Sequence, residues 1–294
     1  MCATADRRVL SRVPQPITSR DNRWLKRFRS ALAGDASGDL VGIEGARLVE
    51  TALRSGVEIS AVLVSESGAR HLARLQPSMP PAARLLRTTD RLFAHAAATE
   101  APQGIAALVR PRAATFDDLV RGLPLVLVMA GVQDPGNVGA LVRTAEAFGA
   151  SGAAACSAGG TGTANPFGPK ALRASAGAAL RLPILCGVAT PILLAQLRVA
   201  GVRVYAACPD SPQAKAPWEA DWRVPAALLI GNEGAGLPAE LVRSADIVVR
   251  IPQSTTPDAA APMDSLNAAV AGSILLYEAA RQRGRGVPAA TGGS

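Results

Sequence analysis

Apolar runs and helical patterns alternate along the second half of the chain. The continuous apolar run at 123–129 precedes a stretch in which apolar residues recur with helical spacing from Val138 to Phe148. The alternation continues to residue 282, with further strands predicted at 152–156, 182–185, 202–207, 226–230 and 246–251 and further helices at 170–180, 192–199, 238–244 and 266–282. Strands that are apolar on both faces and alternate with helices indicate a parallel sheet with helices on both sides.

The first half of the chain predicts a smaller α/β unit. Its pattern indicates helices at 22–32, 46–54, 70–75 and 90–97 and strands at 40–44, 59–64, 85–87 and 105–109. Pro111 and the Ala-rich polar sequence after it break the pattern. We therefore expect a flexible arm at 1–17, a first domain at 18–112, a linker at 113–120, a second domain at 121–284 and a flexible tail at 285–294.

Composition limits the setting of these domains. The chain has 294 residues, of which 49% are hydrophobic, yet no uncharged run approaches the roughly 20 residues that a membrane span needs. The first 20 residues contain basic positions but no continuous apolar stretch of the kind found in signal peptides. We expect a soluble, cytoplasmic protein without a membrane segment.

The charge of the chain favours a polyanionic partner. The formal net charge is +8 and the isoelectric point is about 10.1. Several of the cations lie on or beside one face of the first predicted helix, namely Arg20, Arg23, Lys26 and Arg27. Trp24, Leu25 and Phe28 would anchor that helix by their apolar side chains. The cations predict RNA binding, with an ordinary solvated helix face as the alternative.

Gly-rich or polar loops follow three of the strands in the second half. They span 133–139, 231–236 and 251–267. Glycines allow a backbone to approach a ligand closely, and open α/β sheets bind ligands at such strand ends. Neither the dinucleotide fingerprint G-x-G-x-x-G at a strand end nor a G-x-x-x-x-G-K-[ST] loop is present. A standard NAD site and an ATP P-loop are therefore excluded.

Histidine and cysteine exclude further classes of site. The two histidines, His71 and His95, both lie in the first half, so a hydrolase triad built from the second half is not expected. The cysteines are far apart and form no C-x-x-C pair, which predicts no zinc site and no disulfide framework. They are Cys2, Cys156, Cys186 and Cys208, expected as reduced and mostly buried thiols.

Three ordered segments of the second half resemble the motifs of a known family. They read QDPGNVGALVRTAEAFGA, LLIGNEGAGLP, and RIPQ followed by SLNAAVAGSILLYEA. Together they are similar to the three motifs of the SpoU (TrmH-like) family of RNA 2'-O-ribose methyltransferases, over residues 120–283. The first half resembles, through EGARLVETAL and the basic helix, the small ribosomal-protein-like RNA-binding domain that often precedes this catalytic domain.

The resemblance implies a trefoil-knotted α/β domain with a parallel sheet, preceded by the small α/β RNA-binding domain. Such domains bind S-adenosylmethionine at the knot and are usually homodimers. Since knots are almost absent from proteins, the pattern of the chain alone does not predict one. By position, the resemblance assigns cofactor contacts to Gly231, Ile251 and Leu266, with Cys208 as a further candidate. It assigns catalytic and site-shaping roles to Asn137, Arg143, Glu233, Ser265 and Asn267.

The resemblance also implies RNA as the substrate. The added domain and the basic helix are similar to those of members that modify ribosomal RNA, so 23S ribosomal RNA is the first hypothesis and tRNA the second. A non-catalytic RNA-binding protein that kept the knot is the alternative from another class. No metal ion is expected at the site.

Physical chemistry constrains the role of Arg143. A guanidinium loses its proton only above about pH 12, so its neutral form costs roughly 7 kcal/mol at pH 7. We hypothesise that Arg143 stabilises the ribose 2' oxygen while the proton passes to an RNA phosphate or to water. Methyl transfer then depends mainly on holding the two reactants close and in line. The alternative is an arginine that only covers the helix surface.

Other candidates also have simpler structural explanations. Glu233 could accept hydrogen bonds from its own glycine loop instead of positioning Asn137 or Arg143, and Ser265 or Asn267 could be a helix N-cap. Arg173 could bind the RNA backbone or cover an apolar surface. The segment 252–265 is longer than expected for the third motif and holds extra prolines, which leaves the register of Ser265 open. The apolar residues of the closing helix predict packing and a dimer surface.

Overall fold

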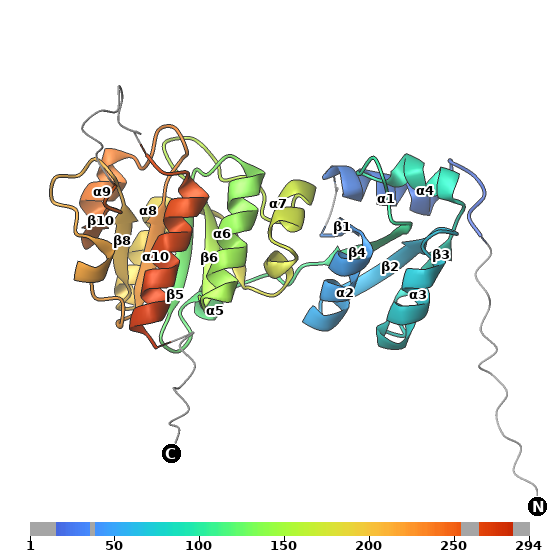
Figure 1. The fold of residues 1–294 in the computed structure, drawn as a ribbon, viewed down its shortest axis with the longest axis horizontal. Coiled ribbons are helices and arrows are strands. Elements are labelled where there is room, and N and C mark those ends of the chain that lie inside the picture. Colours follow the sequence, from blue (N-terminus) through green and yellow to red (C-terminus); the bar gives the residue numbers. More distant parts are fainter. Residues whose placement is uncertain (1–15, 36–38, 254–264, 285–294) are drawn as a thin grey trace, which may run out of the picture. The chain divides into compact units, whose positions relative to one another are not determined.

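A computed structural model of the chain describes residues 16–35, 39–253 and 265–284. The chain forms two compact units, Met1–Arg110 and Pro111–Ser294 (Figure 1). The predicted arm at 1–17 and tail at 285–294 fall largely outside the described residues. Ile17 is an exception within the predicted arm, because its side chain is buried and its backbone pairs with Thr88.

The first unit contains a four-stranded sheet in the order β1-β4-β2-β3. Its strands are β1 (Val41–Glu44), β2 (Glu58–Val64), β3 (Arg84–Arg87) and β4 (Ile105–Arg110). Its helices are α1 (Arg23–Ala33), α2 (Ala46–Ser55), α3 (Ala69–Leu75) and α4 (Asp90–Ala96), with a 3-10 turn η1 (Gln76–Ser78). These elements confirm the predicted α/β pattern. Leu25 and Phe28 of α1 are buried with Phe93 of α4, which fixes the basic helix to the sheet as its apolar residues predicted.

The second unit is built on a six-stranded parallel sheet in the order β10-β8-β9-β5-β6-β7. Its strands are β5 (Leu125–Ala130), β6 (Gly152–Ser157), β7 (Ile184–Ala189), β8 (Arg203–Ala207), β9 (Ala226–Ile230) and β10 (Ile247–Val249). The parallel sheet predicted from the apolar runs is therefore confirmed. Every residue of β5 and β9 is buried, which requires helices on both faces of the sheet.

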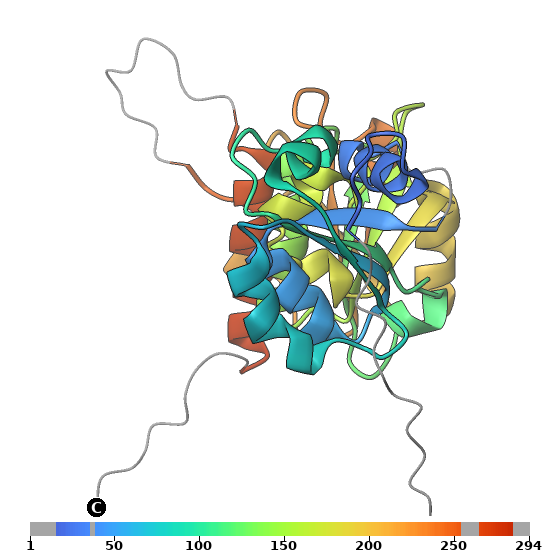
Figure 2. The same cartoon turned by 90° about the vertical axis from the view of Figure 1, so that its right-hand side faces the viewer.

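Helices cover the two faces of this sheet as separate layers (Figures 1 and 2). One face packs on α5 (Phe116–Leu119), α8 (Thr190–Val199) and α9 (Ala239–Ser244). The other packs on α6 (Pro135–Ala147), α7 (Pro169–Ala174) and α10 (Ala268–Gln282), and the 3-10 turns are η2 (Ala178–Leu180) and η3 (Pro217–Glu219). None of the helices in the described ranges is long and apolar enough to cross a membrane.

Two predicted elements differ in the structure. The predicted linker at 113–120 contains α5, whose Leu119 is completely buried in the second unit. A capping box between Thr115 and Asp118 starts this short helix within an otherwise polar stretch. The predicted helix at 170–180 is wrong beyond Ala174, because Ala176 and Gly177 both adopt positive φ angles, of 49° and 81°, and separate α7 from η2.

Helix α6 packs closely against both of its neighbours through small residues. A Cβ atom on Gly139 would lie 2.4 Å from the Ala171 carbonyl oxygen and 2.9 Å from the Ser175 nitrogen. A Cβ atom on Gly272 of α10 would lie 2.3 Å from a methyl carbon of Leu141. Thr144 and Ser273 share a hydrogen bond of 3.0 Å between α6 and α10. These contacts hold α6 in one position over the sheet.

We predict that Gly139→Ala destabilises the protein by about 1–3 kcal/mol, because the added methyl group meets backbone atoms of α7 that cannot move independently. Chemical denaturation measures the change. Gly162→Ala is the matched control, since a Cβ atom there meets nothing within 4 Å, and its free energy of unfolding should stay within about 0.5 kcal/mol of the parent. Equal effects of the two substitutions would contradict the packing argument.

Candidate active site

The site forms where the carboxyl ends of neighbouring parallel strands meet. β5 and β9 are adjacent, with Met129 paired to Ile230, so the loops that follow them start side by side. The first loop leads into α6, whose N-cap is Asp134 and whose first residue is Pro135. The second loop closes on itself through backbone hydrogen bonds between Asn232 and Gly236. The order of the strands in the sheet thus places two candidate motifs together.

A chain of hydrogen bonds joins these loops to the start of α10. Glu233 accepts hydrogen bonds from the Asn137 side-chain amide at 2.9 Å and from the backbone N–H groups of Gln133 and Asp134 at 3.1 and 3.0 Å. The Asn137 side-chain oxygen accepts one from the Asn267 side-chain amide at 3.0 Å. The Asn267 side-chain oxygen caps α10 by accepting from the N–H groups of Ala269 and Val270. Three candidate residues from three motifs therefore form one network.

The network determines the orientation of each amide in it. The Asn267 oxygen must face the free N–H groups at the start of α10, so its NH₂ group faces Asn137. Asn137 then presents its oxygen to Asn267 and its own NH₂ group to the Glu233 carboxylate, which can only accept. Asn267 is therefore the N-cap of α10 and also a partner of Asn137, because its side chain makes the two contacts with different atoms.

Glu233 is a carboxylate in this arrangement. Partial burial by itself raises its pKa, but hydrogen bonds from Asn137, Gln133, Asp134 and its own backbone N–H group outweigh that effect and lower the pKa below its ordinary value. The N–H groups of its own loop at Gly234 and Ala235 are bound instead by the Asn232 side-chain oxygen, each at 2.9 Å. Both alternatives considered for Glu233 have a contact in the structure, because its carboxylate binds the Asn137 side chain and also accepts from its own backbone N–H group.

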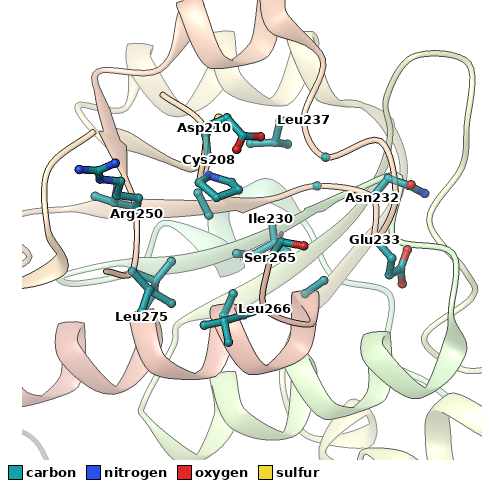
Figure 3. Close-up of a pocket in the computed structure, with 18 of the residues that line it drawn as sticks. Cys208, Asp210, Ile230, Asn232, Glu233, Leu237, Arg250, Ser265, Leu266 and Leu275 are labelled. Atoms are coloured by element: carbon teal, nitrogen blue, oxygen red, sulfur yellow. The ribbon is translucent and has the colours of Figure 1, made fainter. Parts of the chain in front are cut away.

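A cavity of about 490 Å³ lies beside this network, at the ends of β8, β9 and β10 (Figure 3). Its lining includes the four residues assigned to cofactor contacts by resemblance, which are Cys208, Gly231, Ile251 and Leu266. Figure 3 shows Cys208 and Asp210 on one side of the cavity and Leu266 and Leu275 on the other. Ser265 also lines it, although the N-cap of α10 is Asn267 and not Ser265.

Sequence reasoning missed several residues of the site. Asp210 lines the cavity just after β8, and its position beyond a strand end was the signal that could have found it. Asn232 donates a hydrogen bond to the Gly131 carbonyl at 3.0 Å and so ties the second loop to the first. Thr163 accepts hydrogen bonds from the backbone of Gly131 and Val132. Thr163 is 32 and 31 residues from these partners along the chain, so there is no local sign of this role in the sequence.

Arg143 lies apart from the amide network. It follows Asn137 by six residues on α6, which places it about 9 Å farther along the axis and roughly 120° round the helix. Arg143 and Arg173 of α7 are both exposed, and neither side chain forms a hydrogen bond or ion pair with another residue in the described parts of the chain. The other candidates for RNA binding, on and beside α1, lie in the first unit.

The basic helix α1 presents its cations to solvent. Arg20, Arg23, Lys26 and Arg27 are all exposed. Lys26 pairs with Asp21 at 2.9 Å, whereas the Arg27 guanidinium lies 5.5 Å from the ring centre of Trp24. Arg84 of β3 lies 5.2 Å from the same ring, a contact that the sequence did not reveal.

The cysteines of the described residues differ in their exposure. Cys156 is buried, and burial raises its pKa to about 12, whereas Cys186 is exposed and Cys208 is partly exposed. The prediction of mostly buried thiols is therefore wrong for Cys186, which lies on β7 at the edge of the sheet. Among the residues that the structure describes, no group of three or more His, Cys, Asp or Glu side chains could hold a metal ion.

Comparison with known families accounts for both units. The model of the SpoU rRNA Methylase family matches residues 124–277, which is more than half of the chain. The chain belongs to this family. An MRM3-like substrate binding domain matches residues 36–107, so the first unit is a substrate-binding domain. The chain is thus an RNA methyltransferase of the SpoU family.

Individual proteins support this assignment along most of the chain. The 23S rRNA (guanosine(2553)-2'-O)-methyltransferase RlmP of Bacillus subtilis is 32% identical over 237 residues, which cover 80% of this chain and 86% of that protein. An AdoMet-bound rRNA methyltransferase from Sinorhizobium meliloti aligns with a TM-score of 0.75 and 29% identity, covering 91% of this chain and 97% of that one. The SpoU methyltransferase AviRb from Streptomyces viridochromogenes, in complex with AdoMet, aligns with a TM-score of 0.76 and 25% identity, covering 90% and 100%.

The hydrogen bonds of Glu233 predict a pH-dependent stability difference. Because its folded pKa lies below the ordinary value of 4.5, the carboxylate contributes stability that is complete above that value and is lost as pH falls through the folded pKa. Glu233→Gln should therefore lower the free energy of unfolding at pH 7, and its difference from the parent should shrink in acid. Denaturant titrations at a series of pH values measure this. Glu100→Gln, at an exposed position without a described partner, is the control. A difference that stays constant down to about pH 3 would contradict the carboxylate's role.

Proposed function

We propose that this SpoU-family protein is an S-adenosylmethionine-dependent RNA 2'-O-ribose methyltransferase that acts on 23S ribosomal RNA in the cytoplasm. The observation that carries the proposal is the Glu233–Asn137–Asn267 network at the edge of the 490 Å³ cavity. This network orients polar groups on loops that rigid strands and helices support. Such preorganisation is what a transfer reaction limited by alignment requires.

The cavity suits the proposed cofactor. Its volume lies within the range of small-molecule sites, about 300–1,000 Å³. Ile230, Leu266 and Leu275 offer an apolar lining for an adenine ring, and backbone groups at Gly231 and Ile251 offer hydrogen bonds. The cavity lining carries charges of both signs, from Asp210, Glu233 and Arg250, which suits a ligand that has both a positive and a negative group. The cofactor would supply an electrophilic methyl group on a sulfonium.

Arg143 is the proposed stabiliser of the ribose 2' oxygen. Its guanidinium is exposed on α6 and has no partner in the described residues, so it is available to an RNA ligand. In this role the guanidinium keeps its own protons and favours the charge that develops as the hydroxyl proton leaves for a phosphate or water. Asn137 and Asn267 hold the loop that begins α6 and thereby fix the position of the helix that carries Arg143.

The first unit is proposed to bind the RNA backbone. Arg20, Arg23 and Arg27 have no carboxylate partner in the described residues, and Arg84 extends the same surface from β3. The Trp24 ring lies beside both Arg27 and Arg84, which restricts where their guanidinium groups point. Arg173 of α7 is a further candidate. Lys26 is weakened as a candidate, because Asp21 already neutralises it in part.

A trefoil knot and a homodimer complete the proposal. The knot is proposed from the similarity of the three motifs to those of the SpoU family. Exposed apolar residues along α10 support the dimer, since Val270, Ile274 and Tyr277 are 48%, 39% and 54% exposed. Analytical ultracentrifugation of the parent and of Ile274→Glu tests the dimer.

Two measurements test the proposed activity as a whole. Calorimetry with S-adenosylmethionine tests the cofactor, and absence of binding would instead favour a non-catalytic RNA-binding protein. Ribose-methylation mapping of total RNA from cells with and without the gene tests the substrate. Loss of one 2'-O-methyl group from 23S ribosomal RNA is the expected result. A loss confined to tRNA would replace the substrate with the second hypothesis.

Arg143→Lys should lower turnover by at least about tenfold at neutral pH, because an ammonium group cannot reproduce the fixed fork of a guanidinium. Binding of S-adenosylmethionine, measured by calorimetry, should be unchanged. Arg223→Lys is the control, since Arg223 is an exposed arginine paired with Asp221. Near-normal turnover of Arg143→Lys would refute the specific role of the guanidinium.

Replacing Arg23, Arg27 and Arg84 together by Gln should weaken RNA binding and lower the slope of log K against log salt by about two, because each phosphate contact contributes roughly 0.7–0.9. Filter binding over a range of salt concentrations measures the slope. Arg54→Gln/Arg74→Gln is the control, because Glu50 already pairs with both arginines. An unchanged slope would remove this surface from the RNA-binding proposal.

A further inference from the structure

A carboxylate lies where Arg143 would be expected to find a partner. Glu146 follows Arg143 by three residues on α6, and unlike charges at this spacing on a helix normally attract each other. Nevertheless, Arg143 forms no ion pair with any residue in the described parts of the chain. Glu146 is instead paired with another arginine, which is distant from Arg143 in the sequence.

Arg181 occupies both oxygens of Glu146. Its Nε atom donates to one carboxylate oxygen and its Nη2 atom to the other, each at 2.5 Å. The hydrogen bonds to Glu146 raise the pKa of Arg181 above its ordinary value. This is the two-pronged geometry in which a guanidinium binds a carboxylate most strongly. The bidentate pair neutralises the Glu146 carboxylate and holds it in the orientation that Arg181 sets, which reduces its attraction for Arg143.

The position of Arg181 is fixed by the buried turn before it. Arg181 directly follows η2, whose residues Ala178, Ala179 and Leu180 are all buried, and its N–H group donates to the Ala178 carbonyl at 2.9 Å. The η2 turn packs against α6. The guanidinium of Arg181 therefore approaches Glu146 from a rigid support.

The segment from α7 to η2 also pairs with Asp134, the acidic residue at the start of α6. Asp134 and Glu146 are the carboxylates between residues 134 and 147. Lys170 of α7 lies 3.2 Å from an oxygen of Asp134, whose pKa is lowered by hydrogen bonds from Gly136 and Lys170. Lys170 and Arg181 flank the short stretch from α7 to η2, so this stretch pairs with the acidic residue at each end of α6.

We propose that Arg181 is a positioning residue that holds Glu146 away from Arg143 and thereby keeps the Arg143 guanidinium available for the RNA substrate. The inference rests on the role given to Arg143 in the proposed function. In the absence of Arg181, Glu146 turns to Arg143 and competes with RNA for it. The competition is modest, because exposed ion pairs are weak and screened by salt.

Turnover on an unmodified 23S ribosomal RNA transcript tests the competition. Arg181→Ala should lower kcat/KM by about two- to fivefold at low salt, which is the range that exposed ion pairs predict. Arg181→Ala/Glu146→Gln should restore it to near the parent value, and the defect should fade as salt is raised. Arg223→Ala is the matched control from another exposed ion pair. Failure of the second substitution to restore activity at an unchanged melting temperature would overturn the inference.

The same substitutions in an Arg143→Ala background distinguish capture of Arg143 by Glu146 from a general effect of charge on RNA binding. There, RNA affinity by filter binding should not distinguish Arg181→Ala from Arg181→Ala/Glu146→Gln, because the residue that Glu146 captures is gone. An equal gain of affinity from Glu146→Gln with and without Arg143 would overturn the inference and assign the effect to overall charge.

A crystal structure of Arg181→Ala tests the inference without any RNA. The Arg143 guanidinium should lie within about 4 Å of the Glu146 carboxylate. If the two remain apart, the inference fails even when the enzyme is active. If the parent methylates no RNA but the pair forms in the variant, the proposed function fails while the competition between Arg181 and Arg143 for Glu146 stands.

Discussion

The hydrogen-bond chain from Glu233 through Asn137 to Asn267 is the constraint on which the site depends. It links residues that are 96 and 130 positions apart, and every polar group in it has a partner of the correct type. At one end it satisfies the backbone of the loop before α6, and at the other it caps α10. The same bonds that stabilise two helix starts therefore also bring the three motifs together.

The parallel sheet makes this chain of bonds possible. β5 and β9 are neighbours in its centre, so the loops at their carboxyl ends begin within reach of each other. Close packing then limits how far these loops can drift, because Gly139 and Gly272 let α6 approach α7 and α10 at contact distance. A methyl transfer whose barrier depends on alignment needs such rigidity more than it needs a titrating histidine, and neither histidine lies in this unit.

Local patterns predicted most of the elements, whereas contacts between distant residues could not be predicted in the same way. The spacing of Val138, Leu141, Val142 and Ala145 predicted α6, and all of them are buried. The break at Ala176 was missed because helical propensity favours alanine, although Gly177 beside it was a signal. The capping box at Thr115 was also readable but lay in a polar stretch that resembled a linker. The bond between Asn137 and Asn267 left no local trace, because only the fold brings them together.

Helix α6 relates the two functions proposed for the second unit. Asn137 and Arg143 lie roughly 120° apart around its axis, so one side of the helix belongs to the amide network and another presents a guanidinium to solvent. Different neighbours define these two sides, since α10 bonds to the first and the segment from α7 to η2 controls the charges on the second. A rotation of α6 would break the Asn137 bonds and the Glu146 pair together. The position of Arg143 relative to the cavity is therefore set by hydrogen bonds to residues other than Arg143 itself.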